Sequence, residues 1–227
     1  MIAMTNQAVK GCAVLDHLVV AAATLEQGAD YIQGLLGVDA QAGGRHLNQG
    51  THNRLLSLGP DRYLEIIAID PAGKTPVGRR WFGLDDPELQ REIVSRPRLL
   101  TWVARCDDID KRIADAAGGS LDVRPMQRGE VRWRMSFTAD GSLQEHGLVP
   151  PLIQWQSEPH PASRLPDVGC RLVALCAVHP DPGRVKAVLA RLGLDDQIQV
   201  RVAGPGQSPG LSAEIQMPAG GRIIDGV

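Results

Sequence analysis

Cysteine is scarce in this 227-residue chain, and the four that it has are scattered. Cys12, Cys106, Cys170 and Cys176 form no C-x-x-C pair, the spacing typical of zinc and redox sites. Unclustered cysteines in a chain of this length favour free, mostly buried thiols in a reducing compartment over a disulfide framework. The cysteine pattern therefore predicts a cytoplasmic protein.

The sequence also lacks an excess of charge and a long hydrophobic run. Its 24 Lys and Arg residues face 26 Asp and Glu residues, for a net charge of -2. Nucleic acid and anionic membranes both require a basic excess, so neither is expected as a partner. The longest apolar stretches, near Leu18–Leu25 and Leu172–Val178, are far shorter than the roughly 20 residues of a membrane span.

P-loop, nucleophile-elbow and H-E-x-x-H motifs are missing too, which removes three common routes to catalysis.

What the sequence does contain is a pattern that recurs three times. The spacing of apolar residues predicts a strand, a helix and then three strands in each of residues 14–70, 98–157 and 168–227. A polar connector, 71–97, follows the first unit, and the proline-rich stretch Ser157–Asp167 reads as a linker. We expect an α+β fold in which the first two units form a pair over 14–157 and the third is a degenerate copy.

Helix boundaries are the best marked of these predictions. Apolar residues recur at helical spacing over Leu25–Leu36, Thr24 is suited to cap the start, and Gly37 is suited to end the helix. A second, short helix is predicted in the connector at Pro87–Val94.

The first unit resembles the glyoxalase-like domain of the vicinal oxygen chelate superfamily. The segments that carry the resemblance are LDHLVV at 15–20, GGRH at 43–46, GTHN at 50–53, YLEII at 63–67 and, in the second unit, PPLIQW at 150–155. It implies tandem β-α-β-β-β modules whose curved mixed sheets form a half-open barrel around a cavity. In members that use a metal, the resemblance implies a divalent ion held by the first and fourth strands of each paired unit.

His17 and Glu65 occupy those two positions in the first unit, and so are the candidate catalytic residues and metal ligands. Glu65 lies within an apolar run, where an unpaired carboxylate is costly, so it should be paired, protonated or ligating. In the second unit the same alignment places Thr101 beneath His17 and Gln154 beneath Glu65. Thr101 is a poor ligand for Zn, Mn, Ni or Fe and Gln154 a modest one, so a site with no metal stays open.

The stretch Gly43–Asn53 is predicted to be a glycine-rich loop that lines or covers the cavity. Imidazole and amide groups offer donors and acceptors near neutral pH, and ligand pockets usually have apolar walls, for which the tryptophans are candidates. The predicted substrate-binding residues are His46, His52, Asn53, Trp102 and Gln154.

Two functions of different kinds follow from the resemblance. One is a glyoxalase-like lyase, isomerase or dioxygenase acting on a small organic molecule, with a metal as Lewis acid and Glu65 as ligand or base. The other is a non-catalytic protein that binds or sequesters a small molecule, like the bleomycin-binding relatives. A third unit left without a pairing partner would have an open apolar face, which predicts a homodimer; packing of that unit on the first two is the alternative.

Overall fold

The computed structural model describes residues 13–116 and 121–226, so Cys12 and Val227 lie outside the described residues. The first unit contains one helix, which begins and ends as the sequence predicts. The Thr24 side chain accepts a hydrogen bond from the Gln27 N–H at the start, and Gly37 ends the helix with φ of 71°. The elements of this unit are β1 (Val14–Ala21), α1 (Leu25–Leu36), β2 (Gln41–His46), β3 (Thr51–Ser57) and β4 (Tyr63–Ile69).

The connector contains the predicted short helix, and the second unit repeats the order of the first. Asp86 caps the connector helix by accepting from the Glu88 N–H. The connector forms η1 (Trp81–Gly83) and α2 (Pro87–Ser95). The second unit forms β5 (Arg98–Arg105), α3 (Ile109–Ala116), β6 (Asp122–Arg128), β7 (Val131–Phe137), η2 (Gln144–Gly147) and β8 (Leu152–Trp155), and the linker forms η3 (Pro161–Arg164).

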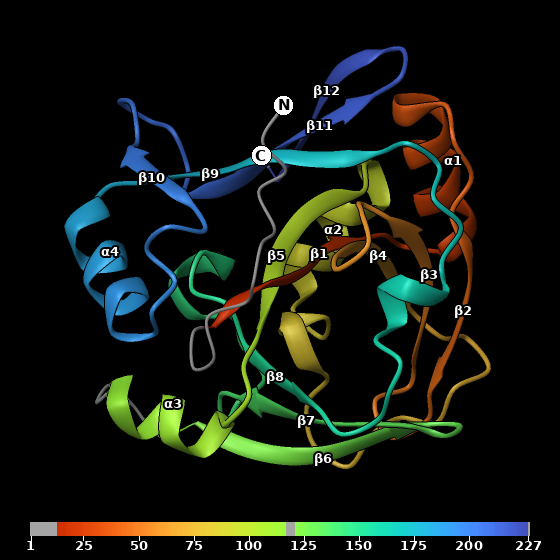
Figure 1. Cartoon of the computed structure of the whole chain (residues 1–227), viewed down its shortest axis with the longest axis horizontal. Coiled ribbons are helices and arrows are strands. Elements are labelled where there is room, and N and C mark those ends of the chain that lie inside the picture. Colours follow the sequence, from red (N-terminus) through yellow and green to blue (C-terminus); the bar gives the residue numbers. More distant parts are fainter. Residues whose placement is uncertain (1–12, 117–120, 227) are drawn as a thin grey trace, which may run out of the picture.

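Strands of the first two units join in one eight-stranded mixed sheet. Its order is β2-β3-β4-β1-β5-β8-β7-β6, with β1 and β5 antiparallel at the centre. The sheet curls so strongly that its edge strands β2 and β6 come into contact (Figure 1). This half-barrel confirms the predicted fold class.

Alternation along the central strands sorts side chains between the inside and the outside of the half-barrel. Leu18 and Val20 of β1 pack in an outer core with α1, whereas Val19 packs in a second core inside the curl. On β5, Trp102 belongs to the outer core and Val103 to the inner one. Only side chains of the inner set can reach the enclosed cavity.

The third unit has the predicted order of elements but a different sheet. It forms β9 (Arg171–His179), α4 (Pro182–Arg191), β10 (Gln199–Val202), β11 (Gly210–Met217) and β12 (Gly220–Asp225). In the first unit the first strand pairs in parallel with the fourth, whereas here β9 pairs in parallel with β10 and the order is β10-β9-β11-β12. The third unit therefore has a different sheet topology from the first. The order of elements along the chain is the same in both, but it does not determine which strands pair.

The apolar face of the third unit is covered by the rest of the chain. Leu175 and Ile215 belong to the same core as Leu18 and Trp102, and β11 and β12 lie along β5 (Figure 1). Asp225, which the sequence aligns with Glu65, instead pairs with Arg96 at 2.7 Å near the surface. The first two units bury the face of the third unit that suggested a homodimer. Among the described residues, no helix is both long and apolar enough to cross a membrane.

Candidate functional site

A cavity opens between the first and second units, inside the curled sheet. Its walls combine polar groups, mostly from the first unit, with aromatic and apolar groups, mostly from the connector and the second unit. The lining residues are His17, His46, Asn53, Tyr63, Glu65, Trp81, Phe82, Arg128, Trp133, Met135, Ile153 and Trp155. The two residues singled out as catalytic candidates thus face one cavity, together with two of the predicted substrate-binding residues.

His17 is oriented by the residue that precedes it. Neighbouring residues of a strand usually point to opposite faces, but the β1–β5 register shifts between Leu15 and His17. At this irregularity the His17 Nδ1 atom lies 2.7 Å from the Asp16 Oδ1 atom. A carboxylate only accepts hydrogen bonds, so Nδ1 carries a proton and Nε2 is directed into the cavity.

Glu65 is buried, and its carboxylate has partners on both oxygens. Its Oε2 atom lies 3.7 Å from the His17 Nε2 atom, and Oε1 accepts a hydrogen bond from the Asn53 amide at 2.5 Å. The Tyr63 ring stacks on the His17 imidazole at 4.6 Å. Burial, with the charges of Asp16 and Glu65, raises the pKa of Tyr63 well above its usual value, so the stacked phenol is neutral.

Asp16 is fully buried and is the centre of a second group of contacts. Besides His17, it accepts from the Trp155 indole at 2.9 Å and from His160 Nε2 at 2.9 Å. His160 Nδ1 accepts from the Ala162 N–H, which leaves the proton on Nε2. Burial raises the pKa of Asp16, but the hydrogen bonds from His160 and His17 outweigh it and hold that pKa well below its usual range. The proline-rich linker therefore supports the site through His160.

Asn53 connects the two ends of the polar wall. Its Nδ2 donates to Glu65, while its Oδ1 accepts from Arg128 Nη1 at 3.0 Å and from the Gly44 N–H at 2.8 Å. His46 lies beside it, with Nδ1 3.1 Å from the Thr51 hydroxyl. Burial, reinforced by the charge of Arg128, lowers the pKa of His46 to about 3, so this imidazole is neutral near pH 7.

The depressed pKa of His46 predicts how stability depends on pH. Between an unfolded value of about 6.5 and the folded value of about 3, the unfolded chain binds a proton that the folded chain excludes. Stability should therefore fall as pH drops below 6.5, by up to about 1.4 kcal/mol per pH unit from this residue. Urea unfolding between pH 7 and 4.5 should show a shallower decline for His46→Gln than for the wild type. Equal slopes would contradict a neutral, buried His46.

Three of the predicted substrate-binding residues lie away from the cavity. His52 alternates with Thr51 and Asn53 along β3 and does not line the cavity. Trp102 belongs to the outer core, where its indole donates to the Leu148 carbonyl at 3.0 Å. Gln154 donates to the Asp107 carbonyl, while its neighbours Ile153 and Trp155 line the cavity. The three predictions failed for the same reason. Successive residues of a strand point to opposite faces, and each of these side chains is one residue away from a position that faces the inside of the half-barrel.

The predicted glycine-rich loop is largely a β-hairpin. Residues 43–46 belong to β2 and residues 51–53 belong to β3, so His46 and Asn53 are held by a sheet rather than by a loop. The two strands place Asn53 in contact with Glu65 and Arg128, and His46 beside Asn53.

The donor set does not fit a four-ligand metal site. The alignment of His17 with Thr101 also aligns Val20 with Ala104. Val20 pairs with Ile66 in the first unit and Ala104 pairs with Leu152 in the second, so the second-unit residue that corresponds to Glu65 is Pro151, not Gln154. Thr101, the second-unit residue aligned with His17, pairs with Val19 across β1 and β5, and its fully buried hydroxyl donates to the Gly147 carbonyl. Within residues 13–116 and 121–226, no group of three or more His, Cys, Asp or Glu side chains is arranged to hold a metal ion. His17 and Glu65 alone are two ligands of the four that the resemblance implies.

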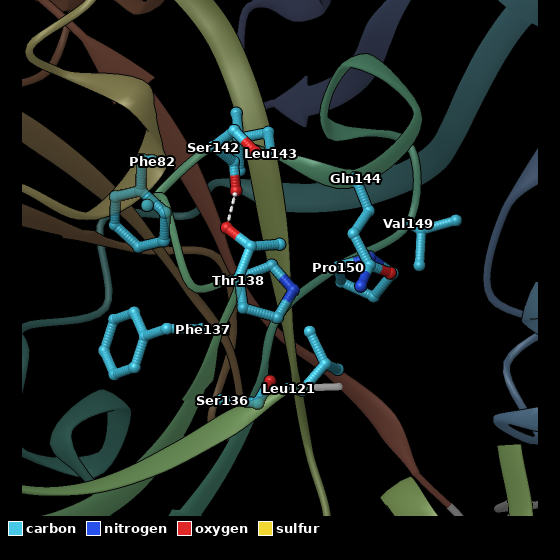
Figure 2. A pocket seen from close by; sticks show the side chains of 12 residues that line it. Phe82, Leu121, Ser136, Phe137, Thr138, Ser142, Leu143, Gln144, Val149 and Pro150 are labelled. Atoms are coloured by element: carbon cyan, nitrogen blue, oxygen red, sulfur yellow. Dashed lines mark hydrogen bonds between the residues drawn. The ribbon is translucent and has the colours of Figure 1, made fainter. Parts of the chain in front are cut away.

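A second pocket of similar size adjoins the first through Phe82, which lines both. Figure 2 shows its walls, where Phe137, Leu143 and Val149 surround an opening bordered by the Thr138–Ser142 hydrogen bond. None of the residues that line this pocket is ionisable. It can hold apolar groups, whereas the titratable side chains of His17 and Glu65 line the other cavity.

Several residues of the site were not predicted from the sequence. Asp16 and Tyr63 lie inside the LDHLVV and YLEII segments, where an acidic residue directly before His17 was an available signal. Arg128 and His160 had none, because only the closure of the sheet and the path of the linker bring them to the site.

A family model described as a glyoxalase-like domain matches residues 15–193. The match spans well over half of the chain, and the chain belongs to this glyoxalase-like family of the vicinal oxygen chelate superfamily. No curated protein matches the chain significantly.

Among solved structures, a hypothetical protein from Staphylococcus aureus shares the fold over nearly the whole chain. It has 10% identity and a TM-score of 0.55, and the alignment covers 94% of this chain and 84% of that one. A methylmalonyl-CoA epimerase from Mycobacterium tuberculosis has 19% identity and a TM-score of 0.40, with 64% and 89% covered. A Streptomyces coelicolor methylmalonyl-CoA epimerase, in complex with 2-nitronate-propionyl-CoA, has 14% identity and a TM-score of 0.39, with 63% and 98% covered.

Proposed function

We propose that the protein is a lyase or isomerase that moves a proton on a small organic molecule held in the cavity, with Glu65 as base and His17 as its partner acid. The observation that carries this proposal is the Asp16–His17–Glu65 array, which brings two proton-transfer groups to one buried wall. A carboxylate and an imidazole in reach of one ligand atom are the usual groups of general acid–base catalysis.

The chemistry follows from the positions of the groups. Glu65 accepts a proton from a carbon next to a carbonyl group, and the electron pair of that C–H bond moves to the carbonyl oxygen. His17, held at Nδ1 by Asp16, donates a proton from Nε2 to that oxygen. In an isomerisation, Glu65 returns its proton to the neighbouring carbon of an enediol while the second hydroxyl gives a proton back to His17 Nε2. In an elimination, a leaving group departs from the neighbouring carbon instead.

The proposal is tested by hydrogen exchange into small carbonyl compounds. A panel of 1,2-dicarbonyls, α-hydroxyketones and 2-oxo acids is incubated with the protein in D₂O, and loss of the α C–H signal is followed by proton NMR. We expect catalysed exchange in at least one compound, with no added metal and in the presence of a chelator. Binding of panel members in the cavity without exchange in any of them would contradict the proposal.

That outcome would favour the second function, a binding or sequestering protein. Only two of the four implied ligand positions carry a ligand, and much of the remaining wall is aromatic, which suits binding without chemistry. The two functions differ in one measurable respect, since a sequestering protein binds the ligand and leaves its C–H bonds unchanged.

Metal binding is expected to be weak. Imidazole and carboxylate favour transition metals, but two ligands hold them far less tightly than four. Titration calorimetry with Mn, Ni and Zn should show no site tighter than about millimolar, and Gln154→Ala should change nothing, since Gln154 lies outside the cavity. A stoichiometric micromolar site that His17→Ala abolishes would restore the metal-assisted mechanism.

A further inference from the structure

Arg128 is a cationic side chain in the cavity wall that has no carboxylate partner. Its guanidinium donates to the neutral amide oxygen of Asn53 at 3.0 Å, and none of the described carboxylates pairs with it. Arginines that do pair with a carboxylate, such as Arg45 with Asp70 and Arg134 with Asp110, lie outside this cavity. A guanidinium that faces a cavity with only a neutral acceptor retains donors for an anionic ligand.

The fold makes room for Arg128 at the seam where β2 meets β6. A Cβ atom at Gly44 would lie 2.7 Å from the Arg128 Cδ atom, and one at Gly43 would lie 2.0 Å from the Asn53 Oδ1 atom. Two consecutive glycines weaken a strand, and they often mark a place where another group approaches closely. Here they admit the Arg128 side chain and the amide that it contacts.

A second donor in the same wall is also without a partner. The indole Nε1 atom of Trp81, which lines the cavity, is buried and has no hydrogen-bond acceptor among the described residues. Asn53 lies between Arg128 and Glu65, because its amide accepts from Arg128 and donates to Glu65. Arg128 therefore offers donors to the cavity, and Glu65 offers an acceptor.

We infer that the ligand of this cavity is an organic oxyanion, a carboxylate or a phosphate ester, whose charged group binds Arg128 while its apolar part contacts Trp133 and Trp155. Asn53 separates Arg128 from Glu65 and contacts both, so an anionic group at Arg128 leaves a nearby carbon of the ligand facing Glu65. The inference rests on the cavity of the proposed function and specifies its substrate as an organic acid with an acidic C–H bond close to the oxyanion.

The test uses three probes of similar shape, namely benzoate, phenyl phosphate and benzamide. Their binding to the full chain is measured by quenching of tryptophan fluorescence, because Trp81, Trp133 and Trp155 line the cavity. At least one anion should bind the wild type about tenfold or more tightly than benzamide, the effect of one charge-assisted hydrogen bond. Preference for benzoate would indicate a carboxylic acid, and preference for phenyl phosphate a phosphate ester.

Arg128→Gln should remove the preference for the anion and leave benzamide binding unchanged. Arg132→Gln is the matched control, since Arg132 is an exposed arginine on the adjacent strand β7 and removes the same charge. Gly44→Ala should weaken anion binding as Arg128→Gln does, because the added methyl group displaces the arginine. Thermal unfolding of each variant shows whether it has kept the fold.

Equal affinity of all three probes would overturn the inference, and so would failure of both anions to bind the wild type at millimolar concentration. An anion preference that survives in Arg128→Gln would also overturn it. The outcome is independent of the proton-transfer chemistry. Arg128-dependent anion binding without C–H exchange would contradict the proposed function alone, and exchange that is equal in wild type and Arg128→Gln would contradict this inference alone.

Discussion

Glu65→Gln should reduce catalysed C–H exchange by about 10²- to 10⁴-fold, the usual contribution of a general base. The substitution keeps the size of the side chain, and the amide oxygen of Gln can still accept the hydrogen bond that Asn53 donates. It removes only the ability to accept a proton at neutral pH. The measurement is the rate of deuterium incorporation by NMR, with the thermal midpoint recorded for the same sample.

The matched control is Glu130→Gln, which removes one carboxylate from an exposed residue that does not line the cavity. This variant should exchange at the wild-type rate. Exchange at an unchanged rate in Glu65→Gln would show that another group is the base, and His17, 3.7 Å away, would be the first to substitute. If Glu65→Gln lost both exchange and the fold, Glu65→Asp would be measured instead. This variant keeps the carboxylate on a shorter side chain, so a folded Glu65→Asp protein with slower exchange would still point to Glu65 as the base.

Trp102→Ala should destabilise the protein by about 3–5 kcal/mol while leaving ligand binding in the cavity unchanged. The side chain is fully buried in the core that joins the first two units to the third, and its indole N–H donates to the Leu148 carbonyl. Removal of the ring leaves a cavity in this core and an unpaired carbonyl oxygen. Chemical denaturation monitored by far-UV circular dichroism measures the loss.

Trp102→Phe keeps most of the ring volume, so it should be less destabilising and should remain folded even if the alanine variant does not. The aromatic control is Trp133→Phe, a change in the cavity wall, which should alter probe affinity more than stability. If Trp102→Ala lowered the free energy of unfolding by less than about 1 kcal/mol, the packing of the third unit would not depend on this core.

Local patterns in the sequence determined the elements and the class of the fold. Thr24 and Gly37 mark the ends of α1 because caps depend on residues within one turn of the helix end. The LDHLVV and YLEII segments identified His17 and Glu65, whose strands β1 and β4 are neighbours within one unit. Such features depend on contacts that are close along the chain or lie within one repeated unit.

The tertiary structure decided everything that depends on strand pairing and sheet closure. The pairing of β5 with β8 places Gln154 on the outer face and makes Pro151 the second-unit residue that corresponds to Glu65, a difference that no alignment of short motifs can detect. The third unit adopted another strand order and buried the apolar face that had suggested a homodimer. Arg128 and His160 reach the site from the far edge of the sheet and from the linker. Their places follow from the curl of an eight-stranded sheet, which is set by packing among residues far apart in the sequence.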